Sequence, residues 1–157
     1  MNYHNLTAQQ ARHFIDHGRL LVAKRIEPQP DKVENGVALL EDMNGLHYDY
    51  ESPFRIGETT KFREPWLDLS YSGHERHAYY QSEALFESCL KKWNEAKTML
   101  SWAIRLSGKC VKVEARIGSQ WTSHHFKDSG LSNYEATKLV VSLMDTWAWF
   151  ATFEKKD

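Results

Sequence analysis

The pattern of apolar and polar positions first predicts a helix near the start of the chain. Ala11 and Phe14 belong to a set of apolar residues at helical spacing, and Thr7 before them is a residue type that caps helix N-termini. Gly18 follows the last periodic residue and can adopt the left-handed conformation that ends a helix. A helix over about residues 8–17 is therefore expected.

The rest of the chain alternates between expected strands and one later helix. Pro28 and Pro30 close the first strand because proline cannot donate to a strand ladder, and a later helix begins at Ser132, where Glu135 completes a capping-box pattern. Met43-Asn44-Gly45 joins a surface hairpin. The expected strands are 19–27, 58–65 after a turn at Gly57, 77–83 and 146–154, with hairpins 36–42/46–51 and, through Gly108, 101–107/110–117.

Two other stretches carry weaker patterns. Residues 70–77, "SYSGHERH", are expected to form a loop, and residues 83–100 have partly helical composition, with a break near Trp93 and Asn94. The interleaving of helices and β segments predicts a small mixed α+β domain, in which a curled sheet or barrel carries helices packed on it. A chain of 157 residues is long enough for one domain with its own core.

Composition and charge narrow the functional classes. The apolar content of 41% and charged content of 26% are those of a folded, soluble protein, and the N-terminal residues contain no secretory signal, so a cytoplasmic location without membrane contact is expected. The net charge of −1 means that bulk electrostatics does not draw the chain to nucleic acid. Any such binding has to come from a local patch, in which some of the twenty aromatic residues could stack on bases.

Metal and thiol chemistry have little support. Cys89 and Cys110 are far apart and form no CxxC pair, so they are read as reduced structural thiols. His74, His77 and the "SHHF" stretch lack a carboxylate or cysteine at a recognisable spacing, so no metal site is expected. No phosphate-binding glycine loop or catalytic triad pattern stands out, and no cofactor is expected.

Four blocks, in the same order along the chain, resemble one known family. They are "ARHFIDHGRLLVAKRIEPQP", "SPFRIGETTKFREPW", "YQSE" with "KWNEAKTMLSWAIRL", and "TWAWFATFE". Together they are similar to the ASCH domain, a branch of the PUA-like superfamily, in the version common in phage and prophage genomes. The resemblance implies a small PUA-like mixed β-barrel with flanking helices, and a protein that binds or acts on RNA or nucleosides.

One branch of that family is an amidohydrolase that removes the acetyl group from N4-acetylcytidine with a Lys and a Thr from a Gly-Arg-Lys-Thr-x-Thr block and a later Glu. Aligned on Gly18, this chain has Leu20 in place of the Lys, Leu21 in place of the first Thr and Ala23 in place of the second. None of these can transfer a proton or attack a carbonyl. Lys24 follows Ala23 directly and so points to the opposite face of a strand, which makes it a poor replacement base. Binding without catalysis is therefore expected.

The expected binding site combines basic and aromatic residues that the resemblance brings together. Lys24 and Arg25 are candidates for phosphate contacts. Glu64 is a candidate acceptor for the exocyclic amine of a base. The neighbouring Trp66 is a candidate stacking face, and at least one of Trp147 and Trp149 is expected in the core. The full expected nucleic-acid-binding set is Arg19, Lys24, Arg25, Arg63, Glu64, Trp66 and Arg105.

Three functions remain open at this level. The first is a module that binds RNA, single-stranded nucleic acid or a modified nucleoside through this basic and aromatic cleft. The second is a nucleoside amidohydrolase of the N4-acetylcytidine type with a rewired site. The third is a phage accessory protein that binds a host protein, since a small, nearly neutral surface with many aromatic residues also suits protein contacts.

Overall fold

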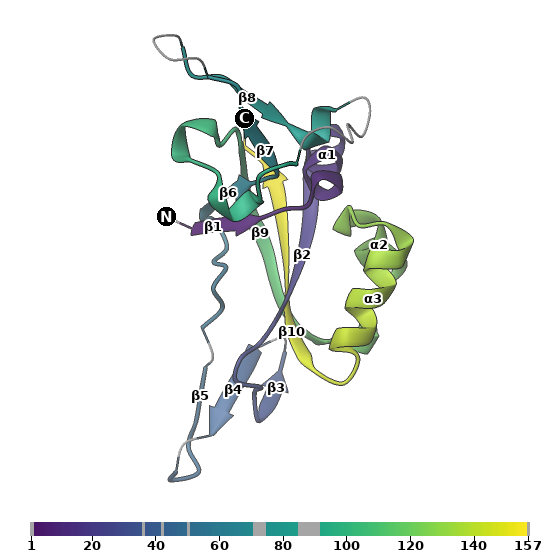
Figure 1. The fold of residues 1–157 in the computed structure, drawn as a ribbon. Coiled ribbons are helices and arrows are strands. Elements are labelled where there is room, and N and C mark those ends of the chain that lie inside the picture. Colours follow the sequence, from purple (N-terminus) through teal and green to yellow (C-terminus); the bar gives the residue numbers. More distant parts are fainter. Residues whose placement is uncertain are drawn as a thin grey trace.

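The computed structural model describes residues 2–35, 37–41, 43–49, 51–70, 75–84 and 92–156, and Figure 1 shows their path. The fold is α+β. Its centre is a five-stranded mixed sheet that curls into a half-barrel, with the strand order β1-β6-β9-β10-β2. The parallel pair is β1 with β6, and the other pairs are antiparallel. These strands are β1 (Asn2–Asn5), β2 (Arg19–Arg25), β6 (Thr59–Arg63), β9 (Leu106–Ile117) and β10 (Trp147–Lys155).

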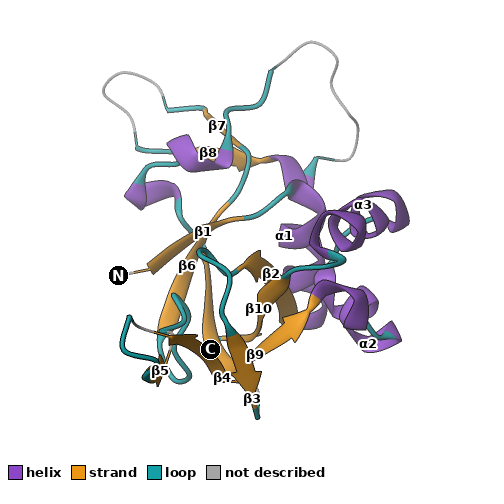
Figure 2. Ribbon diagram, turned by 90° about the horizontal axis from the view of Figure 1, so that it is seen from below, coloured by secondary structure: helices purple, strands orange, loops and turns teal. Residues whose placement is uncertain are grey.

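Two small antiparallel sheets lie at opposite ends of the long strands (Figures 1 and 2). One has the order β3-β4-β5, and the other pairs β7 with β8. Their strands are β3 (Lys32–Glu34), β4 (Val37–Glu41), β5 (His47–Asp49), β7 (Trp66–Asp68) and β8 (Ala78–Tyr80).

The helices begin and end at recognisable caps. In α1 (Ala8–His17), Thr7 and Gln10 form a capping box, and Gly18 ends the helix with a left-handed φ of 69°. The other helices are α2 (Ser123–Ser129) and α3 (Asn133–Leu143). The described residues also form four short 3₁₀ turns: η1 (Gln81–Glu83), η2 (Ala96–Thr98), η3 (Ser101–Ala103) and η4 (Gly118–Gln120).

The two faces of the half-barrel carry separate cores. On the inner face, the rings of Phe14, Phe62 and Phe153 meet edge to face at centroid distances of 5.2 and 5.3 Å. On the outer face, Leu21 and Phe150 pack with residues of α3, including Leu143. Alternate residues of β2 and β10 therefore serve different cores, which is the period of two that a sheet requires.

Several sequence predictions are confirmed. The helix over 8–17, the strand that starts at residue 19, the hairpin around Met43-Asn44-Gly45 and the last strand are all present. The second helix begins where Ser132 accepts a hydrogen bond from the backbone N–H of Glu135. The Oε2 atom of Glu135 is buried without a hydrogen-bond partner, so this carboxylate atom does not complete the capping box.

The hairpin predicted through Gly108 is wrong. Residues 101–103 form a 3₁₀ turn, and β9 runs through Gly108 without a turn. A Cβ atom at Gly108 would lie 2.8 Å from the Phe62 ring and 3.1 Å from Cβ of Phe153. Glycine is present at this position because aromatic rings occupy the space of a side chain, and not because the chain turns.

Other elements differ from the expectation because they are short. The helix α2 and the strands β1, β3 and β7 were not predicted, since each has seven residues or fewer and too few positions to show a period. The break expected near Trp93 and Asn94 is present, because Asn94 bridges to Trp66. Over residues 92–100 the expected helical character is limited to the 3₁₀ turn η2, which follows Asn94, and no α-helix forms there. The rest of that segment, including Cys89, and residues 71–74 of the expected loop, including His74, lie outside the described residues.

Candidate functional site

The structure separates the seven expected binding residues into three places. Arg19 lies at the beginning of β2, where it pairs with Asp128 at 3.3 Å and Glu154 at 3.6 Å. Arg19 lines one cavity, and Lys24 and Arg25, at the other end of the same strand, line a second one. The other four expected residues lie around the segment that leads into β9 and line neither cavity: Arg63, Glu64, Trp66 and Arg105.

Glu64 is a structural anchor in the described structure. Its side chain is fully buried and accepts hydrogen bonds from Arg105 Nε at 3.1 Å, Arg105 Nη2 at 3.0 Å and Ser82 Oγ at 2.8 Å. The carboxylate therefore already has three donors from the protein. The expected role of Glu64 as an acceptor for a base amine does not agree with this geometry, because a buried carboxylate is stable only when its acceptor sites are occupied.

Arg105 is held in the same network. Its guanidinium stacks 3.8 Å from the ring centroid of Tyr80 and forms an ion pair with Glu83. Burial lowers the pKa of Arg105, but hydrogen bonds and charges from Glu64 and Glu83 outweigh it and raise the pKa overall. The cation therefore ties η1 to the segment before β9 and is not free for a phosphate.

Trp66 and Arg63 are also engaged by the protein. Trp66 is 4% exposed, donates from Nε1 to Thr98 Oγ1 at 3.3 Å and packs edge to face on Trp102. Its ring has no open face for stacking, because burial in a small apolar cluster uses both sides. Arg63 donates to Asn5 Oδ1 at 2.8 Å and to the carbonyl of Lys97 at 3.3 Å. The expectation that these residues line one cleft with Lys24 is not met.

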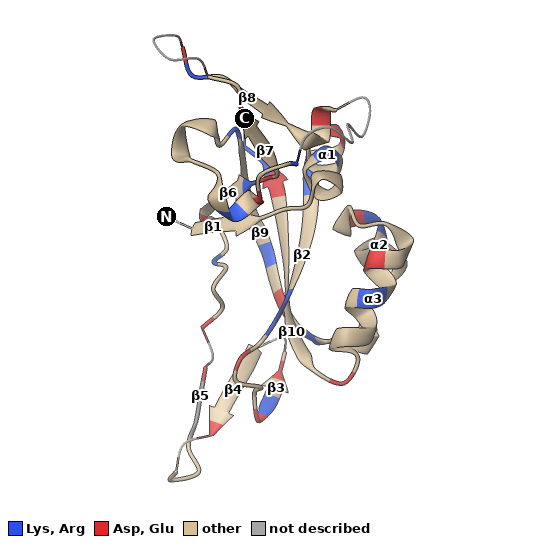
Figure 3. Cartoon of the chain, in the orientation of Figure 1, with Lys and Arg blue, Asp and Glu red and all other residues tan. Residues whose placement is uncertain are grey.

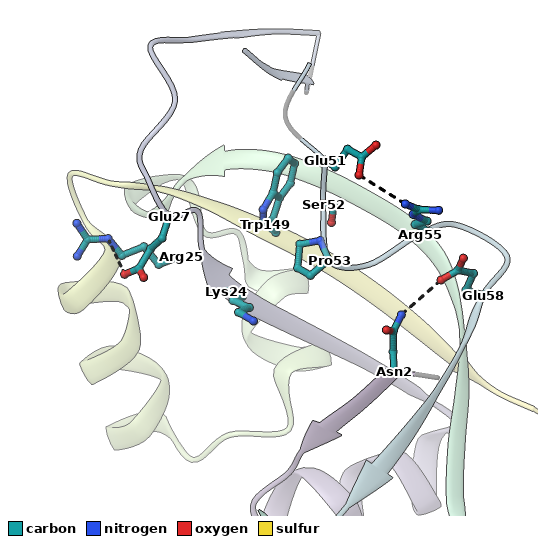
Figure 4. A pocket seen from close by; sticks show the side chains of 10 residues that line it. All are labelled: Asn2, Lys24, Arg25, Glu27, Glu51, Ser52, Pro53, Arg55, Glu58 and Trp149. Carbon is teal, nitrogen blue, oxygen red and sulfur yellow. Dashed lines mark hydrogen bonds and ion pairs between the residues drawn. The ribbon is translucent and has the colours of Figure 1, made fainter. Parts of the chain in front are cut away.

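The best candidate site is a cavity between the two edge strands of the half-barrel (Figure 4). We call it the β1–β2 cavity. Its volume is about 860 Å³, within the range of about 300–1,000 Å³ typical of ligand pockets. Strands β1, β2 and β10, the residues just after β2 and the segment 51–58 contribute its lining: Asn2, Lys24, Arg25, Glu27, Glu51, Ser52, Pro53, Arg55, Glu58 and Trp149.

Lys24 differs from the other two cations of this cavity. Arg25 pairs with Glu27 at 3.9 Å, and Arg55 pairs with Glu51 at 3.5 Å. The side-chain ammonium of Lys24 has no hydrogen bond or ion pair to any residue that the structure describes. Lys and Arg positions elsewhere interleave with Asp and Glu along the strands and helices (Figure 3). The ammonium of Lys24 therefore faces the β1–β2 cavity without a carboxylate partner among the described residues.

The position of Lys24 follows from strand alternation. Leu20 and Val22 of β2 belong to the inner core, and Lys24 is the next residue on that face. In the ladder with β10 it lies opposite Trp149, which also lines the cavity. Trp149 is 5% exposed, so it supplies a narrow part of the wall, and Figure 4 shows its indole beside Ser52 and Pro53. The core role expected for at least one of Trp147 and Trp149 is confirmed.

The same alternation places the residues that replace the amidohydrolase Lys and Thr. Leu20 is fully buried in the inner core, and Ala23 packs on the outer face with the cluster of Leu21 and Phe150. Lys24 is on the face opposite Ala23, as expected, and on the same face as Leu20. A lysine thus remains on the inner face of β2, four residues further along the strand.

The positive charge of Lys24 acts on the nearby imidazole of His4. Its ring packs edge to face against Phe54 and Phe62, with centroid distances of 6.0 and 6.4 Å. Burial lowers the pKa of His4 to about 4, and the charges of Lys24 and Arg63 act in the same direction. The imidazole is therefore neutral at pH 7 and adds no positive charge to that of Lys24.

Sequence reasoning missed most of this lining. Asn2, Ser52, Pro53 and Glu58 come from an unpredicted short strand and from a connecting segment. In this segment the sequence predicted only a turn at Gly57, and it placed Glu58 at the start of the following strand. Nothing within a few residues of these positions indicated that they would meet Lys24.

Metal and thiol groups do not gather near the cavity. No group of three or more His, Cys, Asp or Glu side chains suited to a metal ion occurs in the part of the chain that the structure describes. Cys110 is buried in the inner core, and burial raises the pKa of its thiol. The polar side chains that line the β1–β2 cavity are thus ammonium, guanidinium, amide, hydroxyl and carboxylate groups.

Comparison with known proteins returns no match to a family model, a curated protein or a solved structure. The resemblance to the ASCH domain therefore stays a prediction from the four blocks. Among the described residues, none of the helices has both the length and the hydropathy that crossing a bilayer would need.

Proposed function

We propose that this protein binds a nucleotide of single-stranded nucleic acid, RNA in the first instance, in the β1–β2 cavity, and that it acts by binding and not by catalysis. The proposal includes the PUA-like, ASCH-type identity of the fold. A curled sheet with flanking helices supports that identity, together with the four blocks that resemble the family.

One observation carries the proposal: the Lys24 ammonium is an unpaired cation, among the described residues, in a cavity that also has a small apolar surface. A phosphate oxygen is a strong acceptor for an ammonium group, and such a charge-assisted bond forms here without breaking an existing ion pair. Pro53, which is exposed, supplies most of this apolar surface, and the 5% of Trp149 that is exposed adds a narrow part beside it, so that a base or ribose can pack there. The site thus offers one contact for charge and one for a flat apolar group.

The charges around the cavity favour a single strand over a duplex. The lining contains three cations, Lys24, Arg25 and Arg55, and three carboxylates, Glu27, Glu51 and Glu58. A duplex presents a dense row of phosphates, which the carboxylates repel. A single strand can place one phosphate at Lys24 and turn its base toward Trp149 and Pro53, and a carboxylate can accept from the amine of cytosine or adenine.

The test is a titration of short labelled single-stranded RNA at several salt concentrations, read by fluorescence anisotropy. Binding should weaken with salt, and Lys24→Gln should weaken it by about three- to tenfold at low salt and reduce the slope of log K against log salt by about one. Lys109→Gln is the matched control, because Lys109 is an exposed lysine of β9 outside the cavity lining. Its affinity and slope should equal those of the unmodified protein.

Two results would contradict the proposal. One is the absence of binding to any RNA or DNA strand at low salt. The other is an equal loss of affinity in Lys24→Gln and Lys109→Gln, which would indicate non-specific attraction. A single-stranded DNA of the same sequence, titrated in parallel, shows whether the ribose hydroxyl contributes.

A nucleoside amidohydrolase with a rewired site is the second candidate function. Lys24 shares the inner face with Leu20, and the hydroxyl of Ser52 lines the same cavity, where it accepts a hydrogen bond from the N–H of Phe54. A lysine and a hydroxyl are thus present in new positions. Release of acetate from N4-acetylcytidine by the purified protein, lost in Lys24→Gln, would favour this function over simple binding.

A further inference from the structure

A second cavity lies on the outer face of the half-barrel, away from the β1–β2 cavity. We call it the α2 cavity, and its volume is about 490 Å³. Strands β2, β9 and β10 form one side, and α2 with the residue before it forms the other. The lining residues are Arg19, Leu21, Lys112, Glu114, Arg116, Thr122, His124, His125, Asp128, Phe150 and Thr152.

The lining of this cavity has three cations, Arg19, Lys112 and Arg116, and two carboxylates, Glu114 and Asp128. Arg19 is paired with Asp128 and with Glu154, so the cations open to a ligand are those of β9. Glu114 pairs with two cations at once, Lys112 at 2.6 Å and Arg116. One carboxylate cannot neutralise two cations, so an excess positive charge remains on this part of β9. The pKa of Glu114 is lowered, because these hydrogen bonds and charges outweigh the opposing effect of burial.

The uncharged polar groups of the cavity add hydrogen-bond donors. Nδ1 of His125 accepts a hydrogen bond from the backbone N–H of Thr122 at 2.9 Å, so in the neutral ring the proton is on Nε2. Burial and the charges of Arg116 and Lys112 lower the pKa of His125, while Glu114 and Asp128 oppose them. Thr152, which is 6% exposed, lines the cavity with its short polar side chain.

The floor of the cavity is apolar. Leu21 and Phe150 line it and belong to the outer core, and the ring of His125 stands edge to face on Phe150 at 5.0 Å. Cationic and neutral donors on the walls therefore surround an apolar base. Ligand pockets commonly show this combination of apolar surface with a few convergent polar groups.

We propose that the α2 cavity binds a small organic phosphate, whose phosphate group contacts Lys112 and Arg116 and whose apolar part packs on Leu21 and Phe150. A phosphate is favoured because its oxygens can accept bonds from an ammonium, a guanidinium, an imidazole N–H and a hydroxyl at the same time. Glu114 opposes binding, since it competes for both cations and repels the anion. This site is independent of the proposed RNA site, as the two cavities share no lining residue.

The test is calorimetric titration of the full protein with phenyl phosphate, inorganic phosphate and phenol. Phenyl phosphate should bind more tightly than either of its parts, because only it provides both the anion and the ring. Arg116→Gln should weaken its binding about tenfold or more, the usual loss for a charge-assisted contact. Glu114→Gln should strengthen binding several-fold, which a purely structural role of these residues would not produce.

Lys109→Gln is again the matched control on β9 and should leave the affinity for phenyl phosphate unchanged. If Arg116→Gln does not fold, the affinities of Arg116→Lys and Glu114→Gln are compared instead. Thermal unfolding of each variant tests whether that variant is folded. The absence of saturable binding, or equal affinity in Arg116→Gln and Glu114→Gln, would overturn the proposal. Loss of binding in Lys24→Gln but not in Arg116→Gln would also overturn it, since the ligand would then occupy the β1–β2 cavity.

Discussion

His4 is a titratable ring in an apolar setting, and at the residue scale it links the core to the candidate site. Two phenylalanine rings pack on it, and Lys24 and Arg63 place positive charge nearby. Protonation of the imidazole is therefore opposed both by loss of hydration and by repulsion. An unfolded chain has neither constraint, so the folded and unfolded states differ in their affinity for this proton.

This difference predicts how stability depends on pH. The folded pKa of about 4 lies below the ordinary value of 6.5, so the unfolded state binds the proton first as the pH falls. The free energy of unfolding should fall between pH 6.5 and 4, by about 3 kcal/mol in total from this residue. His4→Gln should remove this part of the pH dependence, measured by urea unfolding at several pH values.

The exposed His77 provides the control for this prediction. His77→Gln should retain the full pH dependence of the unmodified protein. If the free energy of unfolding changes with pH equally in the unmodified protein and in His4→Gln, the pKa of His4 is not lowered by folding and the prediction is wrong.

Glu64 and Arg105 show how residue types alone leave their use undecided. Both side chains are chemically suited to contacts with nucleic acid, and both belong to the binding set expected from the sequence. In the fold they satisfy each other across 41 positions of sequence, together with Ser82 and Glu83. A buried carboxylate needs such partners, and no local pattern predicts which residues will provide them.

At the scale of elements, β9 is the strand that the sequence described least well. Its twelve residues run past Gly108, where the chain passes close to the rings of the inner core. Local reasoning treats a glycine between two apolar runs as a turn. The close aromatic neighbours, which are far away in sequence, are what make glycine necessary within a continuous strand.

Gly108→Ala should therefore destabilise the protein. The added methyl would lie 2.8 Å from the Phe62 ring, 3.1 Å from Phe153 and 3.2 Å from the Phe14 ring. Overpacking of this kind costs about 1–3 kcal/mol, measurable as a lower urea midpoint. Ser107→Ala, at the neighbouring position of β9, is the control and should change stability much less. A Gly108→Ala variant as stable as the unmodified protein would contradict the inference that aromatic side chains crowd this position.

The elements that the sequence predicted correctly carry strong local signals. Thr7 and Gly18 bound α1, and Asn44-Gly45 turns the hairpin of β4 and β5. Each depends on hydrogen bonds or backbone angles within a few residues. The short strands and α2 have no comparable length of pattern, and their partners in the fold stabilise them.

At the scale of the whole molecule, β10 joins the parts of the fold. It pairs with both β9 and β2, and its alternate residues enter the inner and outer cores. The inner core itself includes residues from Leu6 to Phe153. Neither core can form without this strand, so the described structure should unfold as one unit.

The expected result is a single cooperative transition. Unfolding by urea should give the same midpoint when followed by tryptophan fluorescence and by far-UV circular dichroism, because the rings and the strands belong to one cooperative structure. Two separated transitions would show that the chain contains parts that unfold independently.

The α+β class, the caps of α1 and the alternation of β2 were predictable from the sequence. These properties depend on interactions within a few residues. Which charged side chains are free depends on the folded chain: Glu64 is buried against Arg105, Arg25 and Arg55 are paired with carboxylates, and Lys24 faces a cavity beside Trp149. The physical reason is that burial and ion pairing depend on residues distant in sequence, which only the packing of the whole chain brings together.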